Sequence, residues 1–364
     1  MHVFPLQALY WLYGKLVSRL QAACKDNFSR WHGLRLIAAD KTTLALPESK
    51  FLWKCFGAHN GQQGLGPISV ELCCLFDLIS RAPIRFVYDK ACTSEHKLIN
   101  KLIQCIKKGD LLLLDNGFYY SATFINILLR YAHFIIPANK TVRPKVLHTL
   151  GEGDYLCQIK DYDSNTNIIV RVVFIYRNGF RRRRLVTSLL DPSLFPASEL
   201  ANLYHMRWDI ETFYRDFKHT LSATSWHCRT PTSFLQELLM HMITVCLIRI
   251  AMLQAGKLAN LPVGHLSFAR ALTETRLFFK ILLSTVDLLL WHSIWTEFIQ
   301  RCSRHRLYIK PGRQFSRDRQ EYRRKSRGLE KKPRGRKPKY AGETQLQQDR
   351  EALKDRKGNL FLLS

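Results

Sequence analysis

The sequence predicts an α/β protein in which helices flank a mixed sheet. Three observations lead to this prediction. Short apolar runs typical of buried strands alternate with amphipathic helical segments between residues 34 and 139. Strand-like runs separated by Asn, Gly and Asp turns follow at about 140–192, which indicates a β-rich insertion. Helical patterns then dominate from Pro196 to about residue 300, and a basic tail completes the chain.

Composition favours a globular protein with a polyanionic partner. The chain has 364 residues and 46% hydrophobic content, enough for a real core. Its formal charge of +27 points to nucleic acid first and to an anionic membrane surface second. The apolar stretch 234–253 carries Glu237, His241 and Arg249, so we expect a buried core helix there and no membrane span. The ten cysteines lack zinc spacing, and we expect reduced thiols in a cytosol.

A candidate acid ends the first expected strand, and further strands follow it. Residues 1–33 open with the pattern of an amphipathic helix and form the predicted N-terminal segment. In "LRLIAADKTTLALP" an apolar run ends at Asp40, and Lys41–Thr43 suits a turn into a second strand. The runs "GPISVELCCLFDLIS" and "PIRFVYDK" continue the strand series.

A second acid follows a second buried strand. Residues 94–108 have apolar residues at helical spacing after a Ser cap. "DLLLLDNGFYY" is then a wholly apolar run that closes on Asp115 and predicts a central strand. Two strands thus each deliver an aspartate at a carboxyl end, where ligand crevices form in open α/β sheets. A helix over 121–132 and a strand over 133–139 are expected next.

A charged helix is expected from a Ser198 cap to about Leu221, and it contains "YHMRWDIETFYRDFK". At roughly 100° per residue, five side chains share one face of this helix, whereas Asp209 and Asp216 lie well away from it. The five are Tyr204, Arg207, Glu211, Arg215 and Lys218. Such a face is either a solvated ladder of ion pairs or an acid and cations aimed at a phosphodiester.

These residues resemble a known family. Tyr204, Arg207, Glu211 and Lys218 reproduce the Y-x2-R-x3-E-x6-K signature of the insertion-sequence-four family of bacterial DDE transposases. Asp115 opens a D-x-G-[FY] element, and "ADKTTLALP" is similar to the first-aspartate element, with Lys41 in place of the usual glycine. The resemblance covers roughly residues 34 to 250.

The resemblance implies a ribonuclease-H-like fold, with the first acid on the first strand, the second on the fourth, and the glutamate on a later helix. It implies two-metal phosphoryl transfer in which Asp40, Asp115 and Glu211 are catalytic and bind two Mg²⁺ ions, with Mn²⁺ as a substitute. Tyr204, Arg207 and Lys218 would contact DNA phosphates, and Arg215 is an added cation without an assigned role. The implied partners are transposon ends, target DNA and a second copy in a synaptic dimer, without a small-molecule cofactor. The implied location is the bacterial cytoplasm, at the nucleoid.

The predicted domains are the N-terminal segment 1–33, a catalytic domain over 34–300 and a largely disordered tail over 301–364. Residues 301–340 contain seventeen Lys or Arg against three acids. Within them "KKPRGRKPK" is similar to an AT-hook, in which Arg334 and Arg336 would enter a minor groove; a generic basic tail is the alternative.

Three functions stay open at this point. The leading hypothesis is a cut-and-paste DNA transposase. The second is a non-catalytic DNA-binding relic of a transposase, and the third is a related ribonuclease-H-like DNA nuclease. Only 39 residues precede Asp40, so we expect either a compact protein whose tail recognises DNA or a reading frame that starts late.

Overall fold

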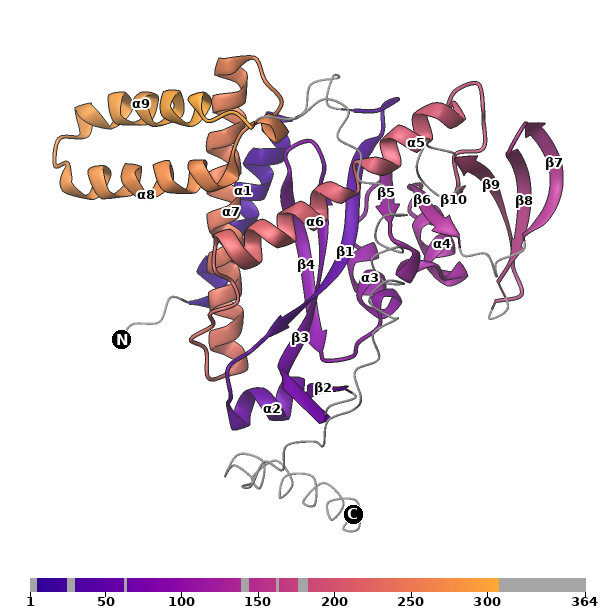
Figure 1. Cartoon of the computed structure of the whole chain (residues 1–364), viewed down its shortest axis with the longest axis horizontal. Helices are drawn as coiled ribbons and strands as arrows, with labels where there is room; N and C mark the ends of the chain where they lie inside the picture. The colour runs from indigo at the N-terminus through magenta and orange to yellow at the C-terminus, as the bar shows by residue number, and fades with distance from the viewer. Residues whose placement is uncertain are drawn as a thin grey trace, which may run out of the picture. The chain divides into compact units, whose positions relative to one another are not determined.

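A ten-stranded mixed sheet forms the centre of the protein, in the order β2-β3-β1-β5-β6-β10-β9-β8-β7, with β4 also paired to β3 (Figure 1). The computed structural model describes residues 5–24, 30–61, 64–138, 144–161, 164–175 and 183–307. These residues all belong to one unit, Met1–Gln314, and the α/β fold class is confirmed. The predicted boundaries near residues 33 and 300 stay predictions, and most of the basic tail, with Arg334 and Arg336, lies outside the described residues.

Five strands, besides the four-residue β2, make the part of the sheet that carries the candidate acids. β4, β3 and β1 pair antiparallel, and β1, β5 and β6 pair parallel. The short β2 (Ala58–Gly61) adds to β3. In chain order, Asp40 lies on the first of these five strands and Asp115 directly follows the fourth. This is the order that the family resemblance implies. The five are β1 (Arg35–Ala45), β3 (Gly64–Asp77), β4 (Ala82–Lys90), β5 (Asp110–Leu114) and β6 (His133–Ala138).

β1 does not end at Asp40, which corrects the predicted turn over Lys41–Thr43. The strand continues to Ala45 because its polar second half keeps pairing with β3, for example Lys41 with Cys73 and Thr43 with Glu71. β5, in contrast, is buried along its whole length and ends at Leu114, as its apolar run predicts. Asp40 therefore lies in the middle of β1, where the shorter β5 leaves the sheet.

The β-rich insertion extends the same sheet. Its antiparallel strands join the core through the pairing of β10 with β6, so it does not stand apart as a separate layer. The first of them was not anticipated because its residues are mostly exposed and lack alternation. The strands are β7 (Lys145–Gly151), β8 (Asp154–Lys160), β9 (Asn167–Ile175) and β10 (Arg183–Thr187).

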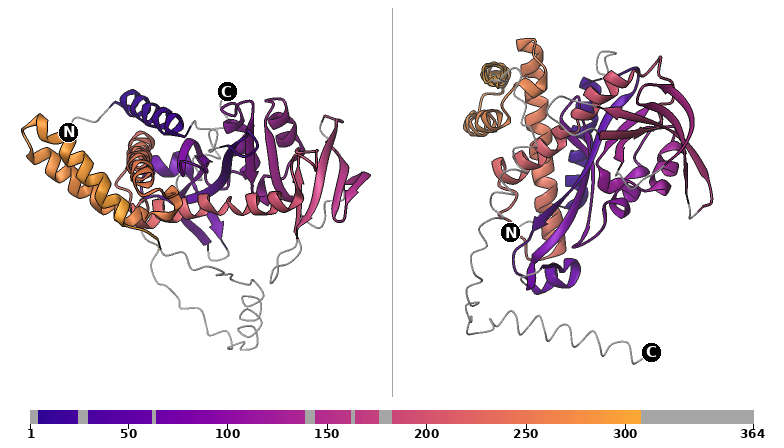
Figure 2. Two further views of the ribbon diagram at one scale, coloured as in Figure 1. Left: turned by 90° about the horizontal axis from the view of Figure 1, so that it is seen from above. Right: turned by 45° about the vertical axis from the view of Figure 1, so that its right-hand side comes forward.

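Helices cover both faces of the sheet. In the left view of Figure 2, α5 and α6 run along one face, and α3 and α4 lie on the other. α3 ends at Ile103, short of the predicted residue 108. The short α2 packs on β3. These helices are α2 (Lys50–Phe56), α3 (Glu95–Ile103), α4 (Ser121–Leu128), α5 (Ala197–His205) and α6 (Trp208–Arg215).

The remaining helices pack around one apolar helix, α7 (Pro231–Ala259). Its length and composition would suit a membrane span, yet 67% of its most apolar window is buried inside the protein, so it is the predicted core helix. α1 (Leu6–Ala23) packs on α7, as do α8 (Phe268–Ser284) and α9 (Trp291–Arg304). Six of the ten cysteines are buried, in agreement with their predicted packing in the core.

An internal ion pair fastens the insertion to the segment before α5. Arg171 on β9 is fully buried, and its Nε donates to Asp154 Oδ1 on β8 at 2.8 Å. Its Nη1 donates to the carbonyl oxygen of Phe195 at 2.6 Å. Because a buried guanidinium needs partners for its donors, both contacts are required for the site to be favourable.

We predict that Asp154→Ala lowers the free energy of unfolding by about 3–5 kcal/mol, because it leaves the Arg171 charge buried without its acid. The double variant Asp154→Leu/Arg171→Met should lose less than the single one, since no charge then stays buried. Urea unfolding followed by circular dichroism measures both. A loss below about 1 kcal/mol for Asp154→Ala, typical of an exposed pair, would contradict the prediction.

Candidate active site

Two aspartates lie side by side where β1 and β5 part. The parallel register pairs Ala39 of β1 with Leu114 of β5. Asp40 and Asp115 are the next residues after this pair, so they lie beside each other. Adjacent strands are about 5 Å apart, which brings the two carboxyl groups to the same crevice. The topology thus places together the two acids that the sequence predicts as catalytic.

The Asp40 carboxyl carries the largest electrostatic penalty of this site. The pKa of Asp40 is raised to about 7: burial raises it most, Arg207 and the Lys41 amide lower it, and the charges of Asp115 and Glu211 raise it. The Lys41 N–H donates to Asp40 Oδ1 at 2.9 Å. A carboxylate in such surroundings is stabilised by added positive charge.

The α5–α6 region is fastened to both strands by tyrosine hydroxyls. Tyr204 donates to the Leu114 carbonyl oxygen at 3.1 Å, one residue before Asp115. Tyr214 donates to the Asp40 carbonyl oxygen at 2.7 Å and accepts from the Cys74 amide at 3.1 Å. The Tyr204 side chain is buried, and its only hydroxyl proton is engaged by Leu114. In this conformation Tyr204 has no donor left for a phosphate.

This region is not the single helix that the sequence predicts. α5 begins at Ala197 after Pro196, so Ser198 lies inside the first turn and is not the cap. α5 then ends at His205, α6 runs from Trp208, and a π-helix, Asp216–Thr220, follows. The predicted angles hold only approximately across these changes, because a π-helix and a break alter the rotation per residue.

Arg207, in the break between the helices, is the central cation of the site. Its Nη2 lies 2.5 Å from Glu211 Oε1 and 3.8 Å from Asp115 Oδ1. The Arg207 side chain is only 6% exposed, whereas the two acids are about half exposed, at 50% and 48%. Arg207 therefore sits beneath the acids and neutralises them, while their outer oxygens face solvent.

The donor set is suited to a hard divalent cation. Asp40, Asp115 and Glu211 offer only carboxylate oxygens, the ligands preferred by Mg²⁺ and Mn²⁺, and the Asp40 carboxyl gains most from added positive charge. As the side chains stand, no three His, Cys, Asp or Glu residues within the described part of the chain converge closely enough to hold an ion. Instead, Arg207 Nη2 lies between two of the acids, 2.5 Å from Glu211 Oε1 and 3.8 Å from Asp115 Oδ1.

The other residues of the predicted helical face differ in their surroundings. Lys218, on the π-helix, is partly buried; burial lowers its pKa, and the charges of Glu71 and Asp40 oppose that shift. Arg215 is exposed on α6. The two acids set aside by the helical geometry pair elsewhere: Asp209 contacts Arg81 at 2.8 Å, and Asp216 lies 3.9 Å from Arg249.

Sequence reasoning missed Tyr214 and a fourth carboxyl group, Glu95. A Cβ at Gly117 would overlap the Glu95 carboxyl, so the glycine of the D-x-G-[FY] element leaves room for this close approach. Glu95 Oε2 is buried without a partner among the described residues, and burial raises the Glu95 pKa. Tyr214 had a signal, because its helical angle lies near the predicted face; Glu95, twenty residues before Asp115, had none.

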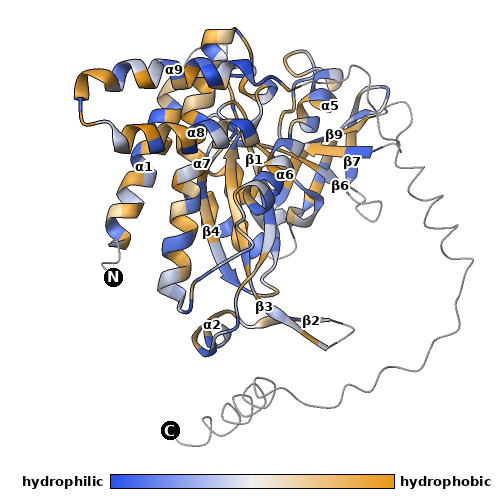
Figure 3. Cartoon of the chain, turned by 60° about the vertical axis from the view of Figure 1, so that its left-hand side comes forward, coloured by the Kyte–Doolittle hydropathy of each residue, from blue (hydrophilic) through white to orange (hydrophobic). Residues whose placement is uncertain are grey.

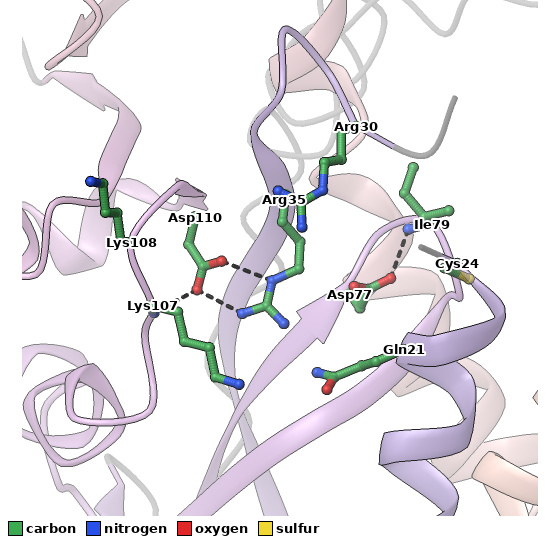
Figure 4. Close-up of a pocket in the computed structure, with 9 residues that line it drawn as sticks. All are labelled: Gln21, Cys24, Arg30, Arg35, Asp77, Ile79, Lys107, Lys108 and Asp110. Carbon is green, nitrogen blue, oxygen red and sulfur yellow. Dashed lines mark hydrogen bonds and ion pairs between the residues drawn. The ribbon is translucent and has the colours of Figure 1, made fainter. Parts of the chain in front are cut away.

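A separate cavity of about 200 Å³ lies at the opposite ends of β1 and β5 (Figure 4). There Arg35 donates from Nε and Nη2 to the two oxygens of Asp110 at 2.8 and 2.7 Å. This bidentate pair joins the first residues of the two strands and shares no residue with the acidic cluster. It fixes the register that brings Asp40 level with Asp115.

The sheet and the two neighbouring aspartates agree with the architecture that the family resemblance implies. The family model for the transposase DDE domain matches residues 31–247, and the chain belongs to this family. The family comprises polynucleotidyl transferases and nucleases, which generally use divalent metal ions. The predicted resemblance to insertion-sequence-four transposases is confirmed.

Two curated relatives are similar over part of the chain. The transposase InsG for insertion sequence element IS4 of Escherichia coli (strain K12) is 28% identical over 257 residues, 66% of this chain and 58% of the relative. A probable transposase for insertion sequence element IS5377 of Geobacillus stearothermophilus is 28% identical over 119 residues, 33% of this chain and 31% of that protein. This chain therefore spans less than two thirds of the length of either relative.

A solved structure is also similar. It is a cryo-EM structure of a piggyBac transposase synaptic complex with hairpin DNA. The identity is 12%, the TM-score is 0.39, and the match covers 85% of this chain and 60% of that one.

We predict that Asp40→Asn stabilises the metal-free protein at pH 8 and has little effect near pH 3.5. In the folded protein the Asp40 pKa of about 7 lies above the ordinary value of 3.8. Ionisation of Asp40 therefore does not reduce the stability below pH 3.8, and it reduces it fully above pH 7. The gain at pH 8 should be about 2–4 kcal/mol. Chemical unfolding in EDTA at both pH values measures it.

Asp191→Asn is the control of opposite sign. Amide hydrogen bonds from Ser193 and Leu194 lower the pKa of Asp191, so this substitution should destabilise the protein at pH 8 and lose its effect at low pH. Equal effects of Asp40→Asn at the two pH values would refute the assignment of a raised Asp40 pKa.

Proposed function

We propose that this protein is a DNA transposase that cleaves and joins the strands of an insertion sequence by a cut-and-paste route. The observation that carries the proposal is that Asp40 and Asp115 follow one another across neighbouring strands, while Arg207 contacts both Asp115 and Glu211 of α6. The bacterial transposase relatives support DNA as the substrate. A bacterial origin would place the protein in the cytoplasm, at the nucleoid.

In this proposal the three carboxyl groups hold two Mg²⁺ ions, or Mn²⁺ in their place. Bound there, the ions would activate a water or 3′-hydroxyl and stabilise the leaving oxygen during in-line attack. The chain itself positions the acids: Tyr204 and Tyr214 fix α5 and α6 against β5 and β1, and Arg207 neutralises Glu211 and Asp115 before a cation binds.

DNA phosphates would meet the cations around the crevice. Arg215 is exposed, and Lys218 is close enough to Asp40 for their charges to interact. Phosphate oxygens accept hydrogen bonds from such side chains, which position the backbone without reading its sequence. We propose Arg207, Arg215 and Lys218 as phosphate contacts, Tyr204 as a positioning residue, and Arg334 and Arg336 in the tail as further DNA contacts.

The deciding experiment is cleavage of DNA carrying the element's own ends. Glu211→Gln and Asp115→Asn should each lower Mg²⁺-dependent cleavage by at least about 10³-fold, because each removes a charged ligand worth several kcal/mol in the transition state. Glu199→Gln is the matched control, since Glu199 is an exposed acid of α5 that pairs with His32. It should keep full activity.

The alternatives predict different results in the same assay. A non-catalytic relic would bind DNA in a salt-sensitive way without nicking it in Mg²⁺ or Mn²⁺. A related nuclease would cut DNA irrespective of the end sequence and would not join strands. Cleavage that survives in Glu211→Gln would refute the proposed catalytic set.

We also propose that the protein acts as a homodimer, and the support lies at the tip of the α8–α9 hairpin. The residues around this connection are apolar, and the ribbon at this end of α8 and α9 is mostly orange in Figure 3. Leu283, Val286 and Leu289 are 85%, 96% and 87% exposed. Contiguous exposed apolar patches of this kind mark interaction surfaces, and a two-fold axis lets one patch cover its copy.

Val286→Asp/Leu289→Asp should shift the protein from dimer to monomer, weakening association by about tenfold or more, because two charges would be buried in an apolar interface. Sedimentation velocity over a concentration series measures the change. Leu129→Asp is the control. Leu129 is a leucine like Leu289, is 71% exposed, and lies far from the hairpin in the sequence, at the C-cap of α4. If the two variants associate equally strongly, the tip of the hairpin is not the dimer contact.

A further inference from the structure

A second cluster of reactive side chains lies near the acidic crevice, at the end of the sheet formed by β2, β3 and β4. Cys92 follows β4, His59 lies on β2 and Glu71 lies on β3. Cys92 Sγ is 3.2 Å from His59 Nδ1, and His59 Nε2 is 2.7 Å from Glu71 Oε1. The three groups form a chain of contacts from thiol to imidazole to carboxyl.

The carboxyl end of this chain is fixed. Glu71 is fully buried, and its other oxygen accepts from the Thr43 hydroxyl at 3.0 Å and lies 3.5 Å from Lys41 Nζ. Because a carboxylate only accepts hydrogen bonds, His59 Nε2 carries the proton that joins it to Glu71. His59 Nδ1 then faces Cys92 with a free lone pair, which is the arrangement required of a base.

The thiol end of the chain is open. Cys92 is exposed, and His59 is 42% exposed on its side chain, so a small reagent has access to both. Cys92 also has a backbone φ of 64°, in the left-handed region that side chains rarely adopt. Such strain persists only where surrounding contacts fix it, as the His59 contact does here.

We propose that Cys92, His59 and Glu71 form a reactive-thiol site that takes low-molecular-weight disulfides. A nucleophile, a base within hydrogen-bond reach and a third group that orients the base are the parts that activate a thiol. His59 Nδ1 receives the Cys92 proton as the sulfur attacks one sulfur of the disulfide. The S–S bond of the reagent breaks, a mixed disulfide forms on Cys92, and the leaving thiolate takes the proton from His59.

This step balances without a further oxidant, since one disulfide is exchanged for another and one thiol is released. The site is independent of the proposed DNA chemistry, although Lys41, the neighbour of Asp40, contacts both Glu71 and the Thr93 carbonyl oxygen.

The chain contains its own control, Cys55. It is also exposed, but burial and the charge of Asp89 raise its pKa, and it has no His partner among the described contacts. The experiment treats the full-length protein with oxidised glutathione at pH 7 and follows each cysteine-containing peptide by mass spectrometry. Cys92 should form the mixed disulfide at least about tenfold faster than Cys55, in keeping with the gain from a general base.

His59→Gln should lower the Cys92 rate by about tenfold or more, because the base is lost, and leave the Cys55 rate unchanged. An unchanged Cys55 rate also shows that the variant is folded, and His59→Phe serves as a second variant if Gln disturbs the fold. Equal rates for Cys92 and Cys55 in the unmodified protein would overturn the proposal without any variant. A Cys92 rate that is insensitive to both His59 variants would overturn it as well.

Discussion

The candidate active site depends on charge compensation between partly buried Asp40 and the guanidinium of Arg207. Burial and two neighbouring acids oppose ionisation of Asp40, and Arg207 is the main charge that favours it. Arg207 can act in this way because the chain breaks between α5 and α6, which brings a nearly buried cation under Asp115 and Glu211. The rest of the local structure serves to hold this break in place: Tyr204 fixes its first side to β5, and Tyr214 fixes its second side to β1.

Local patterns predicted the buried parts of the fold well. The apolar run of β5, the amphipathic α3 and the core helix α7 follow from hydrophobic periodicity, because burial itself creates that pattern. The failures occur where a distant partner decides the structure. Lys41–Thr43 stays extended because β3 supplies hydrogen bonds on its flank, and β7 is a strand because β8 pairs with it. Neither partner is visible in a local window.

The same distinction applies to the site. Asp115 could be predicted because it follows a strand with a strong pattern, and Asp40 could be predicted even though the strand was ended too early. Glu95 was not predictable, since its position over Gly117 depends on how α3 meets the turn after β5. The contact between Arg207 and Glu211 has the i, i+4 spacing of an ordinary helical ion pair, and only burial of Arg207 distinguishes it from a surface ladder.

Under the proposed function, this ion pair has a consequence for the order of events at the crevice. Glu211 cannot direct both oxygens to a divalent cation while one of them stays 2.5 Å from Arg207, so bidentate binding of a cation by Glu211 would require that contact to loosen. Loosening it would leave a buried guanidinium with fewer partners, and its Nε already has none among the described residues. An unpaired buried guanidinium is costly, and a phosphate oxygen at the crevice would remove that cost. Cation binding and phosphate binding would therefore favour each other through Arg207, without any movement of the strands that carry the aspartates.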